Sequence, residues 1–597
     1  MFLRRIERRK NGKTHIYWHI VENKRLDGGR VVQRHVLYLG EINSSQAQAW
    51  RKAIEVFDAD AGRSQTLALF PEDRWEVADE ASVVRLRLCQ MRLHRPRQWG
   101  ACWLAGLLWR DLRLDRFWAE RLPASRKRTR WDHVLEVLVA YRLIAPGSEW
   151  RLHREWFNNS AMADLLGSDF GLAEAHKLYA CHDLLLAHKD ALFSHLTQRW
   201  RDLFNADFDV LLYDLTSTYF EVNAADLPED AKRRHGYSRD KRPDCPQLVI
   251  ALIVTPEGLP LAYEVLPGNT ADSKTLPMFL SKIETQYGKA RRVWVMDRGV
   301  PTEAALAQMR ASDPPVQYLV GTPKGRLNRL EKHLIEKPWR KAREGVEVKL
   351  LAQDEELYVF AQSAERVAKE RAMRRRQLKW LWARLDKLAA MNVSYEEKLM
   401  KLGAARSKAP AAWRLVDVSL DKQSAALSYS LNRGKLRIAR RREGRYLLRT
   451  NLTDRDPAVL WQYYVQLVAV EEAFKTLKGD LAIRPIFHQD ERRIEAHIFV
   501  AFLAYALQVT LTRRLHALAP GLTARSALEK FAAVQMIDVH LPTTDGREIV
   551  LTRYTQPEPE LQLLIDRLRL TLPAQPPPKI TVAALRKQSR RSDDLFA

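Results

Sequence analysis

The chain has 597 residues, of which 46% are hydrophobic and 29% charged, a balance typical of globular proteins that bury sizeable cores over several domains. Lys and Arg outnumber Asp and Glu by 98 to 73, and the net charge of +25 favours a polyanionic partner such as nucleic acid over a merely basic surface. The four cysteines are scattered without a CxxC pair, which argues against a disulfide framework or a zinc module and fits a reducing compartment.

Neither the N-terminus nor any apolar run indicates a membrane protein. The first residues, MFLRRIERRKNGK, contain no apolar core of the signal-peptide type. The most apolar run, IFVAFLAYALQV from Ile498, is shorter than the roughly 20 residues needed to span a bilayer. We therefore expect a cytoplasmic protein in which this run forms a buried helix.

The N-terminal third is predicted to hold a β-hairpin followed by helices. In residues 1–60, two alternating β runs flank the turn LDGG, which is a hairpin pattern. Residues 61–204 are predicted to be mainly helical, because segments such as WDHVLEVLVAYRLI repeat apolar residues at three- and four-residue spacing. This all-α region, with the basic cluster Ser125–Arg130, is a candidate for DNA binding, although its helices match no known reader motif.

From about residue 205 the pattern becomes β-rich, with the order β-β-β-α-β-α-β. Meandering strands followed by helix-linked strands predict an α/β fold, with a mixed sheet and helices on its faces. A β run, a long charged helix and further strands then precede a helix that begins near Pro457. The predicted parts are the hairpin region 1–60, the helical region 61–204, the core 205–324, an insertion 325–455, the rest of the core 456–520 and a C-terminal region 521–597.

Two aspartates follow apolar runs in the predicted sheet. Asp214 ends the run VLLYD, and Asp297 ends the run VWVMD. Open α/β sheets bind their ligands at such an edge, and neighbouring strands would bring the two carboxylates together. A divalent cation relieves the repulsion between crowded carboxylates, and a third carboxylate from a helix on the sheet would complete a two-metal site for phosphoryl transfer. Taken alone, each aspartate is more often structural, as a turn residue or a helix cap.

The segment YYVQLVAVEEAFKTLKGD is predicted to be one helix. Its seven-residue spacing places Tyr464, Glu471 and Lys478 on one face, whereas Glu472 points about 100° away. Lys475 lies one turn after Glu471, so a surface ion pair is the ordinary alternative to a metal-binding role. Helix geometry alone favours that ion pair, and the role of Glu471 therefore depends on the two aspartates upstream.

Three segments, LLYDLTSTYFE, VWVMDRGVPT and the long segment that starts with YYVQLVAVEEAFKTLKGD, together resemble bacterial insertion-sequence transposases of the Asp-Asp-Glu class. The resemblance is to the branch with a Tyr-x2-Arg-x3-Glu-x6-Lys signature and covers about residues 200–515. The signature spacing falls on Tyr464, Leu467, Glu471 and Lys478. Leu467 stands where the branch has Arg, so a phosphate contact is missing there, and Arg298 or Arg484 is a candidate to supply it.

The resemblance implies a ribonuclease-H-like catalytic core interrupted by a β-rich and helical insertion. By position, Asp214, Asp297 and Glu471 would be the catalytic residues and would bind two Mg²⁺ (or Mn²⁺) ions. One ion would activate water and later a DNA 3′-hydroxyl, and the other would stabilise the leaving 3′-oxygen. The residues expected to contact DNA are Tyr464, Lys478, Arg298, His235, Arg239 and Lys241. The last three belong to HGYSRDKRPDCPQL, which also resembles the branch, although a charge run is often only a solvated face.

The same resemblance implies the partners. These are double-stranded DNA, as terminal inverted repeats and target DNA, and a second copy of the chain in a paired-end complex. The expected location is the bacterial cytoplasm, at the nucleoid when DNA is bound, with no membrane association. Two alternatives stay open: a ribonuclease-H-like nuclease or resolvase with the same acids, and a catalytically inactive DNA-binding derivative, for which Leu467 leaves room.

Overall fold

The computed structural model divides the chain into two compact units. Unit 1 comprises Met1–Leu104, Arg154–Phe170 and Ser526–Ala597, and unit 2 comprises Ala105–His153 and Gly171–Arg525. The backbone is described for residues 2–10, 13–25, 31–41, 54–58, 63–67, 85–125, 129–167, 170–222, 227–228, 231–272, 275–287, 292–297, 299–322, 337–353, 355–441, 443–452 and 456–582.

The described part of unit 1 is built on small antiparallel sheets. Strands β2 (Lys13–Arg25) and β3 (Val31–Glu41) pair on either side of the expected turn, and β1 (Phe2–Lys10) adds a third strand to this sheet. A second sheet has the order β20-β19-β18-β6, and β4 pairs with β5. Their bounds are β4 (Ile54–Asp58), β5 (Arg63–Leu67), β6 (Arg92–Gln98), β18 (Gln535–Pro542), β19 (Arg547–Tyr554) and β20 (Lys579–Val582). Because β5 and β6 lie within residues 61–204, the expectation of an all-α region there was wrong, and in the described residues the α-helices begin only at α2 (Gly100–Asp111), after β6.

One buried arginine joins the strands of the second sheet. The Arg97 guanidinium is almost fully buried on β6 and donates to both carboxylate oxygens of Asp538 on β18, at 3.0 and 3.1 Å. Asp164 accepts a further bond from the Arg97 Nε at 2.9 Å. Beside them, the Trp99 ring stacks on Tyr554 with the ring centroids 4.2 Å apart. This part of unit 1 therefore combines an aromatic core with a neutralised buried charge.

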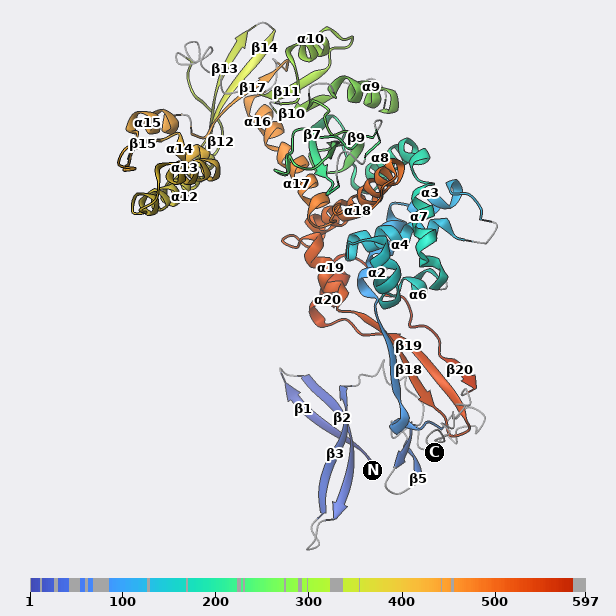
Figure 1. The fold of residues 1–597 in the computed structure, drawn as a ribbon. Helices are drawn as coiled ribbons and strands as arrows, with labels where there is room; N and C mark the ends of the chain where they lie inside the picture. The colour runs from blue at the N-terminus through green and yellow to red at the C-terminus, as the bar shows by residue number, and fades with distance from the viewer. Residues whose placement is uncertain are drawn as a thin grey trace, which may run out of the picture. The chain divides into compact units, whose positions relative to one another are not determined.

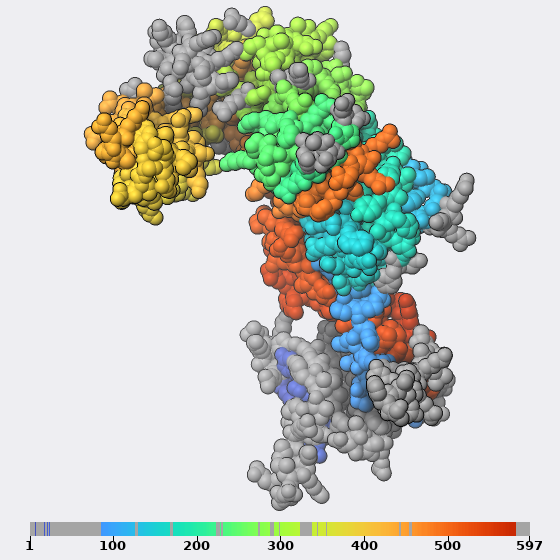
Figure 2. Space-filling view, in the orientation of Figure 1, coloured from blue at the N-terminus to red at the C-terminus, as the bar shows by residue number. Residues whose placement is uncertain are grey.

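In unit 2, a group of helices packs around the long helix α18 (Glu491–Leu518), seen in dark orange between the green strands and the teal helices in Figures 1 and 2. Aromatic side chains of α18, such as Phe502, pack against Tyr263 of the sheet with the ring centroids 4.8 Å apart. Helix α2 (Gly100–Asp111) crosses from unit 1 into unit 2. The other helices are α3 (Leu114–Arg121), α4 (Trp131–Ile144), α5 (Glu149–Arg151), α7 (Ala175–His182) and α8 (Lys189–Phe204).

Helix α18 contains the apolar run noted in the sequence. By length and composition this helix of 28 residues is able to cross a membrane, but 94% of its most apolar window is buried inside the fold, as expected of a core helix. The prediction of a buried helix is confirmed, and the helix extends well beyond the apolar run in both directions.

The centre of unit 2 is a nine-stranded mixed sheet with the order β12-β13-β14-β17-β11-β10-β7-β8-β9 (Figure 1). Strand β10 runs parallel to both β7 and β11, and the other neighbours are antiparallel. The predicted order β-β-β-α-β-α-β and the predicted mixed sheet are both confirmed. The elements are β7 (Val210–Tyr219), β8 (Gln247–Val254), β9 (Pro260–Pro267), α9 (Leu276–Tyr287), β10 (Val293–Met296), α10 (Glu303–Ala311) and β11 (Gln317–Gly321).

Residues 325–455 contribute both to this sheet and to a smaller cluster. Strand β17 pairs with β11 at the edge of the predicted core, and β14 pairs with β17, so these strands continue the core sheet. The helices α12–α14 and the β15-β16 ribbon enclose their own small core around Leu381, Leu385 and Leu402. The bounds are β12 (Arg340–Arg343), β13 (Val346–Gln353), β14 (Glu356–Ser363), α12 (Ala364–Ala389), α13 (Tyr395–Lys408), α14 (Pro410–Trp413), β15 (Val416–Leu420), β16 (Leu427–Leu431), α15 (Arg433–Arg441) and β17 (Arg445–Thr450).

The segment predicted as one helix from Tyr463 to Asp480 is two helices, and this expectation was wrong. Helix α16 (Pro457–Val465) ends before Gln466, and α17 (Leu467–Lys478) follows it. At the break the amide of Ala469 donates to the Gln466 carbonyl at 2.8 Å, a tighter connection than the regular α-helical bond. Tyr464 therefore lies on a different helix from Glu471 and Lys478.

Candidate active site

Asp214 and Asp297 lie on neighbouring parallel strands. The register pairs Met296 of β10 with Tyr213 of β7, so that Asp297 follows the end of β10 beside Asp214. Strand β7 does not end at Asp214, as its apolar run suggested, because it continues to Tyr219 while paired with β8. Strand β10 therefore stops beside Asp214, and this leaves room for a side chain from another element.

Glu471 approaches this point from helix α17, which packs on β7 and β8. The buried face of α17 includes Val470, Phe474 and Leu477, which anchor it to the sheet. Asp214, Asp297 and Glu471 together line two adjoining cavities of about 410 and 330 Å³. In the described part of the chain no ion pair joins Glu471 to Lys475, so the surface pair considered from the sequence does not form.

The electrostatic environment of Asp214 reflects this crowding. Burial raises the pKa of Asp214 to about 7, and the charges of Asp297 and Glu471 act in the same direction. The Leu215 amide and the Arg239 guanidinium oppose the rise. A carboxylate whose ionisation is resisted by two others is stabilised by a cation, and a set of oxygen donors suits Mg²⁺ or Mn²⁺. The residues present therefore fit a divalent metal ion.

Arg239 lies in the second cavity with the three acids. Its guanidinium contacts both carboxylate oxygens of Asp272 at 2.6 Å, which fixes the side chain at the cavity wall. Its backbone amide donates to the Ser217 hydroxyl on β7 at 3.1 Å. The segment after β7 is thereby attached to the strand that carries Asp214.

Lys478 is connected to the same segment by an ion pair. Its ammonium group donates to both oxygens of Asp240, at 3.0 and 3.2 Å, and Arg484 contacts Asp240 at 3.2 Å. Burial lowers the pKa of Lys478, although the bonds to Asp240 act to raise it. The Arg484 guanidinium also lies over the ring of Tyr219 at 4.6 Å. Two cations therefore share one carboxylate close to the end of α17.

The larger cavity is lined by further cations and aromatic rings that the sequence reasoning missed. Arg366 lies over the Tyr446 ring at 4.3 Å and donates to its hydroxyl group. The rings of Tyr446 and Tyr464 are 5.8 Å apart, so Tyr464 does reach the cavity despite the helix break. The other basic and aromatic lining residues are Lys369, Arg445 and Trp461. No local sequence pattern identifies Arg366 and Lys369 as site residues, because they reach the cavity only through the pairing of β14 and β17 with the core sheet.

The remaining predicted site residues lie elsewhere or outside the described chain. His235 and Lys241 are exposed and line neither of the two cavities. Arg298 falls outside the described residues. Glu472 is exposed and lines a different cavity with Lys475 and Tyr505, which agrees with its predicted orientation away from the acids.

Comparison with known families gives two matches along the chain. A family model described as "Transposase DDE domain" matches residues 209–507, which span all three acids. A second, described as "IS1634 family transposase, N-terminal domain", matches residues 3–65. Both matches favour a transposase over the nuclease or resolvase considered from the sequence, and the mixed α/β sheet fits a ribonuclease-H-like core.

Solved and curated proteins add little to these matches. One solved structure, a cryo-EM structure of a piggyBac transposase synaptic complex with hairpin DNA, is 9% identical and covers 75% of this chain and 81% of its own, with a TM-score of 0.33. A likeness at this TM-score identifies neither fold nor activity. A search of the curated proteins finds no match.

Proposed function

Because this chain belongs to the DDE transposases of bacterial insertion sequences, we propose that it cuts the terminal inverted repeats of its element from flanking DNA and joins them to a target. The enzyme is a polynucleotidyl transferase and endonuclease that acts on DNA. We assign the catalytic role to Asp214, Asp297 and Glu471. The observation that carries this assignment is that these three carboxylates, from β7, the end of β10 and α17, line the same two cavities.

The same three carboxylates would hold Mg²⁺ or Mn²⁺, as a pair of ions in the two-metal arrangement. When bound, the ions supply Lewis-acid chemistry for activating water or a DNA 3′-hydroxyl and for stabilising the leaving 3′-oxygen. The chain itself presents the carboxylates from β7, the end of β10 and α17, and the pKa of Asp214, raised to about 7, means that this carboxyl is partly protonated near neutral pH in the metal-free site. Metal binding is therefore expected to release that proton.

Cations around the acids would hold the DNA backbone. Arg239 stands at the wall of one cavity and Arg366 at the other, and Lys478 and Arg484 lie behind Asp240. A DNA phosphate could replace Asp240 as the partner of Lys478, because the ammonium group is already oriented to bind an anion. Arg366 and its neighbour Lys369 would contribute the positive charge that the branch signature places at position 467, where this chain has Leu.

We further propose that residues 1–60 and residues 61–204 bind the terminal repeats, with Lys241 and His235 on an exposed basic loop contributing contacts. The catalytic core would comprise 205–324 and 456–520, with 325–455 as an insertion and 521–597 as a C-terminal region. Two copies of the chain would act together in a paired-end complex. The net charge of +25 supports a DNA partner, and the expected site of action is chromosomal DNA in the cytoplasm.

The test is a cleavage and joining assay on DNA that carries the sequences flanking the gene. With Mg²⁺, the purified chain should nick these ends at fixed positions and join them to a second DNA molecule. Omission of the metal should abolish both products, because the carboxylates alone supply no Lewis acid. Scrambled ends of equal length are the matched control for recognition of the repeats.

Two results would contradict the proposal. Cleavage of branched DNA without any joined product would favour a resolvase. Specific binding of the ends without cleavage in either Mg²⁺ or Mn²⁺ would favour an inactive DNA-binding derivative.

A further inference from the structure

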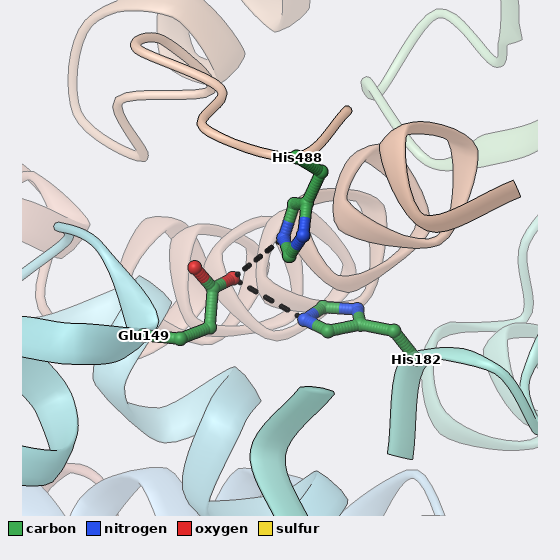
Figure 3. Close-up of side chains that lie close together, drawn as sticks. All are labelled: Glu149, His182 and His488. Atoms are coloured by element: carbon green, nitrogen blue, oxygen red, sulfur yellow. Dashed lines mark hydrogen bonds and ion pairs between the residues drawn. The ribbon is translucent and has the colours of Figure 1, made fainter. Parts of the chain in front are cut away.

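A buried cluster of histidines surrounds one carboxylate in the helical part of unit 2. Glu149, the first residue of α5, is 3% exposed, and His182 at the end of α7 is 1% exposed. His488 comes from the segment between α17 and α18, and it too is buried. Figure 3 shows His182 and His488 approaching the same oxygen of Glu149 from different elements. Charged groups buried at this depth normally require a partner of opposite charge.

The distances in the cluster are long for hydrogen bonds to a carboxylate. The Nε2 atoms of His182 and His488 lie 3.2 and 3.3 Å from Oε1 of Glu149. Charge-assisted N–H···O⁻ bonds are shorter, about 2.7–2.9 Å. Two ligands bound to one tetrahedral zinc ion at its usual bond lengths lie about 3.3 Å apart. One potential ligand atom from each of the three residues falls within 4.8 Å of the others.

Two further residues border the cluster. The Nδ1 atom of His497, on α18, lies 3.3 Å from Oε1 of Glu149, which makes it the nearest candidate for a fourth ligand. Arg142 donates to the Ala482 carbonyl at 3.0 Å and lies 3.5 Å from the same His497 nitrogen. Arg142 and Glu149 attract each other electrostatically, so without a metal ion the buried carboxylate would be stabilised by this charge and by the three imidazoles.

We infer that Glu149, His182 and His488 form a structural site for a transition-metal ion, with zinc as the expected occupant. Two imidazoles and one carboxylate are a ligand set typical of zinc, whereas Mg²⁺ prefers oxygen ligands. The site is distinct from the three acids that line the cavities described above. A metal here would tie α5 and α7 to the segment that directly follows α17, the helix of Glu471. Its role is to fix that connection, and the inference does not depend on DNA cleavage.

The test measures metal bound to the whole chain, purified without a histidine tag, after incubation with zinc and gel filtration. Mass spectrometry of the elements should find about one zinc ion, or one iron, nickel or copper ion in its place, per chain. The variants Glu149→Gln and His182→Gln should each hold less than about a tenth of this amount. His195→Gln is the matched control, because His195 is a half-buried histidine bonded to the Leu112 carbonyl outside the cluster, and its metal content should be unchanged.

A second measurement needs no variant and covers the case in which a substitution prevents folding. Cobalt(II) loaded into the metal-depleted wild-type chain should give the intense visible absorption of a four-coordinate site, and a strong chelator should lower the melting temperature. A wild-type chain that binds no transition metal would overturn the inference and leave the imidazoles as the hydrogen-bond partners of Glu149. Metal that is bound equally well by the folded Glu149→Gln variant would overturn it as well.

Discussion

Asp214 stands close to Asp297 and Glu471, and its charge is the most constrained feature of the candidate active site. Because the pKa in the folded chain, about 7, lies above the ordinary value of 3.8, ionisation of Asp214 opposes folding in the absence of metal. Protonated Asp214 therefore contributes to the stability of the folded chain, and this contribution is fully present below pH 3.8 and is lost as the pH rises through about 7. The loss amounts to a few kcal/mol at most.

The Asp214→Asn variant, which carries no charge, should therefore gain stability relative to the wild type as the pH rises. In EDTA, its melting temperature should exceed that of the wild type by a few degrees more at pH 8 than at pH 5. Thermal unfolding at the two pH values measures this difference. Glu472→Gln, which removes a carboxylate from the other side of α17, is the control for loss of a charge from this helix, and an equal offset for Asp214→Asn at both pH values would contradict the raised pKa.

At the scale of elements, the start of α12 supplies cations to the candidate active site. Arg366 and Lys369 are exposed and line the larger cavity beside the three acids. Replacing both with Ala should weaken binding of the cleaved DNA end about tenfold or more, because two phosphate contacts are lost. Filter binding or fluorescence anisotropy gives the dissociation constant. The control is the double variant Arg375→Ala, Arg376→Ala, whose side chains are exposed on the same helix away from the cavity.

An unchanged affinity for the Arg366, Lys369 double variant would remove α12 from the site. A loss of the same size in the control would show only that the general charge of the helix matters. A fall in the slope of log Kd against log salt by about 2 for the first variant alone is the expected signature of two specific phosphate contacts.

A close backbone contact attaches the basic loop that carries Arg239 to the sheet. A Cβ atom added at Gly268 would overlap the carbonyl oxygens of Gln247 and Arg234, and one added at Gly236 would overlap the Gly268 carbonyl. Gly268→Ala should therefore destabilise the fold by about 3 kcal/mol, measured by urea unfolding. Gly403→Ala is the control, since nothing lies within 4 Å of a Cβ there. Equal stability of the two variants would contradict the tight contact.

The elements also show what local sequence does and does not determine. The order of strands and helices along the core segment follows from apolar runs and turn residues, and the parallel pairing of β7 with β10 places Asp297 beside Asp214. The break at Gln466 was missed because the segment holds neither proline nor glycine at that point. The contribution of β14 and β17 to the sheet, and with it Arg366, depends on long-range pairing that no local periodicity reveals.

At the scale of the whole molecule, the excess of positive charge predicts how DNA binding responds to salt. If 6–10 phosphates are neutralised, affinity should fall by about three to five orders of magnitude between 50 and 200 mM salt. A titration of labelled end DNA at several salt concentrations measures this slope. An affinity that is nearly independent of salt would contradict a mainly electrostatic interface and point to apolar contacts.

The family match and the mixed sheet both point to a DDE transposase. The assignment of the third catalytic acid depends on the position of one helix, α17. Helix α17 presents Glu471 to the two aspartates and Glu472 to another cavity. These neighbouring glutamates are both exposed and differ mainly in direction, which makes them a matched pair.

The most direct measurement of the central claim is the single-turnover rate of Mg²⁺-dependent end cleavage for Glu471→Gln and Glu472→Gln beside the wild type. Glu471→Gln should lower the rate at least about a hundredfold, because it removes a metal-binding charge, while binding of the DNA end persists. Glu472→Gln should stay within about threefold of the wild type. A wild-type rate for Glu471→Gln, or an equal loss in both variants, would contradict the assignment of Glu471 to the active site.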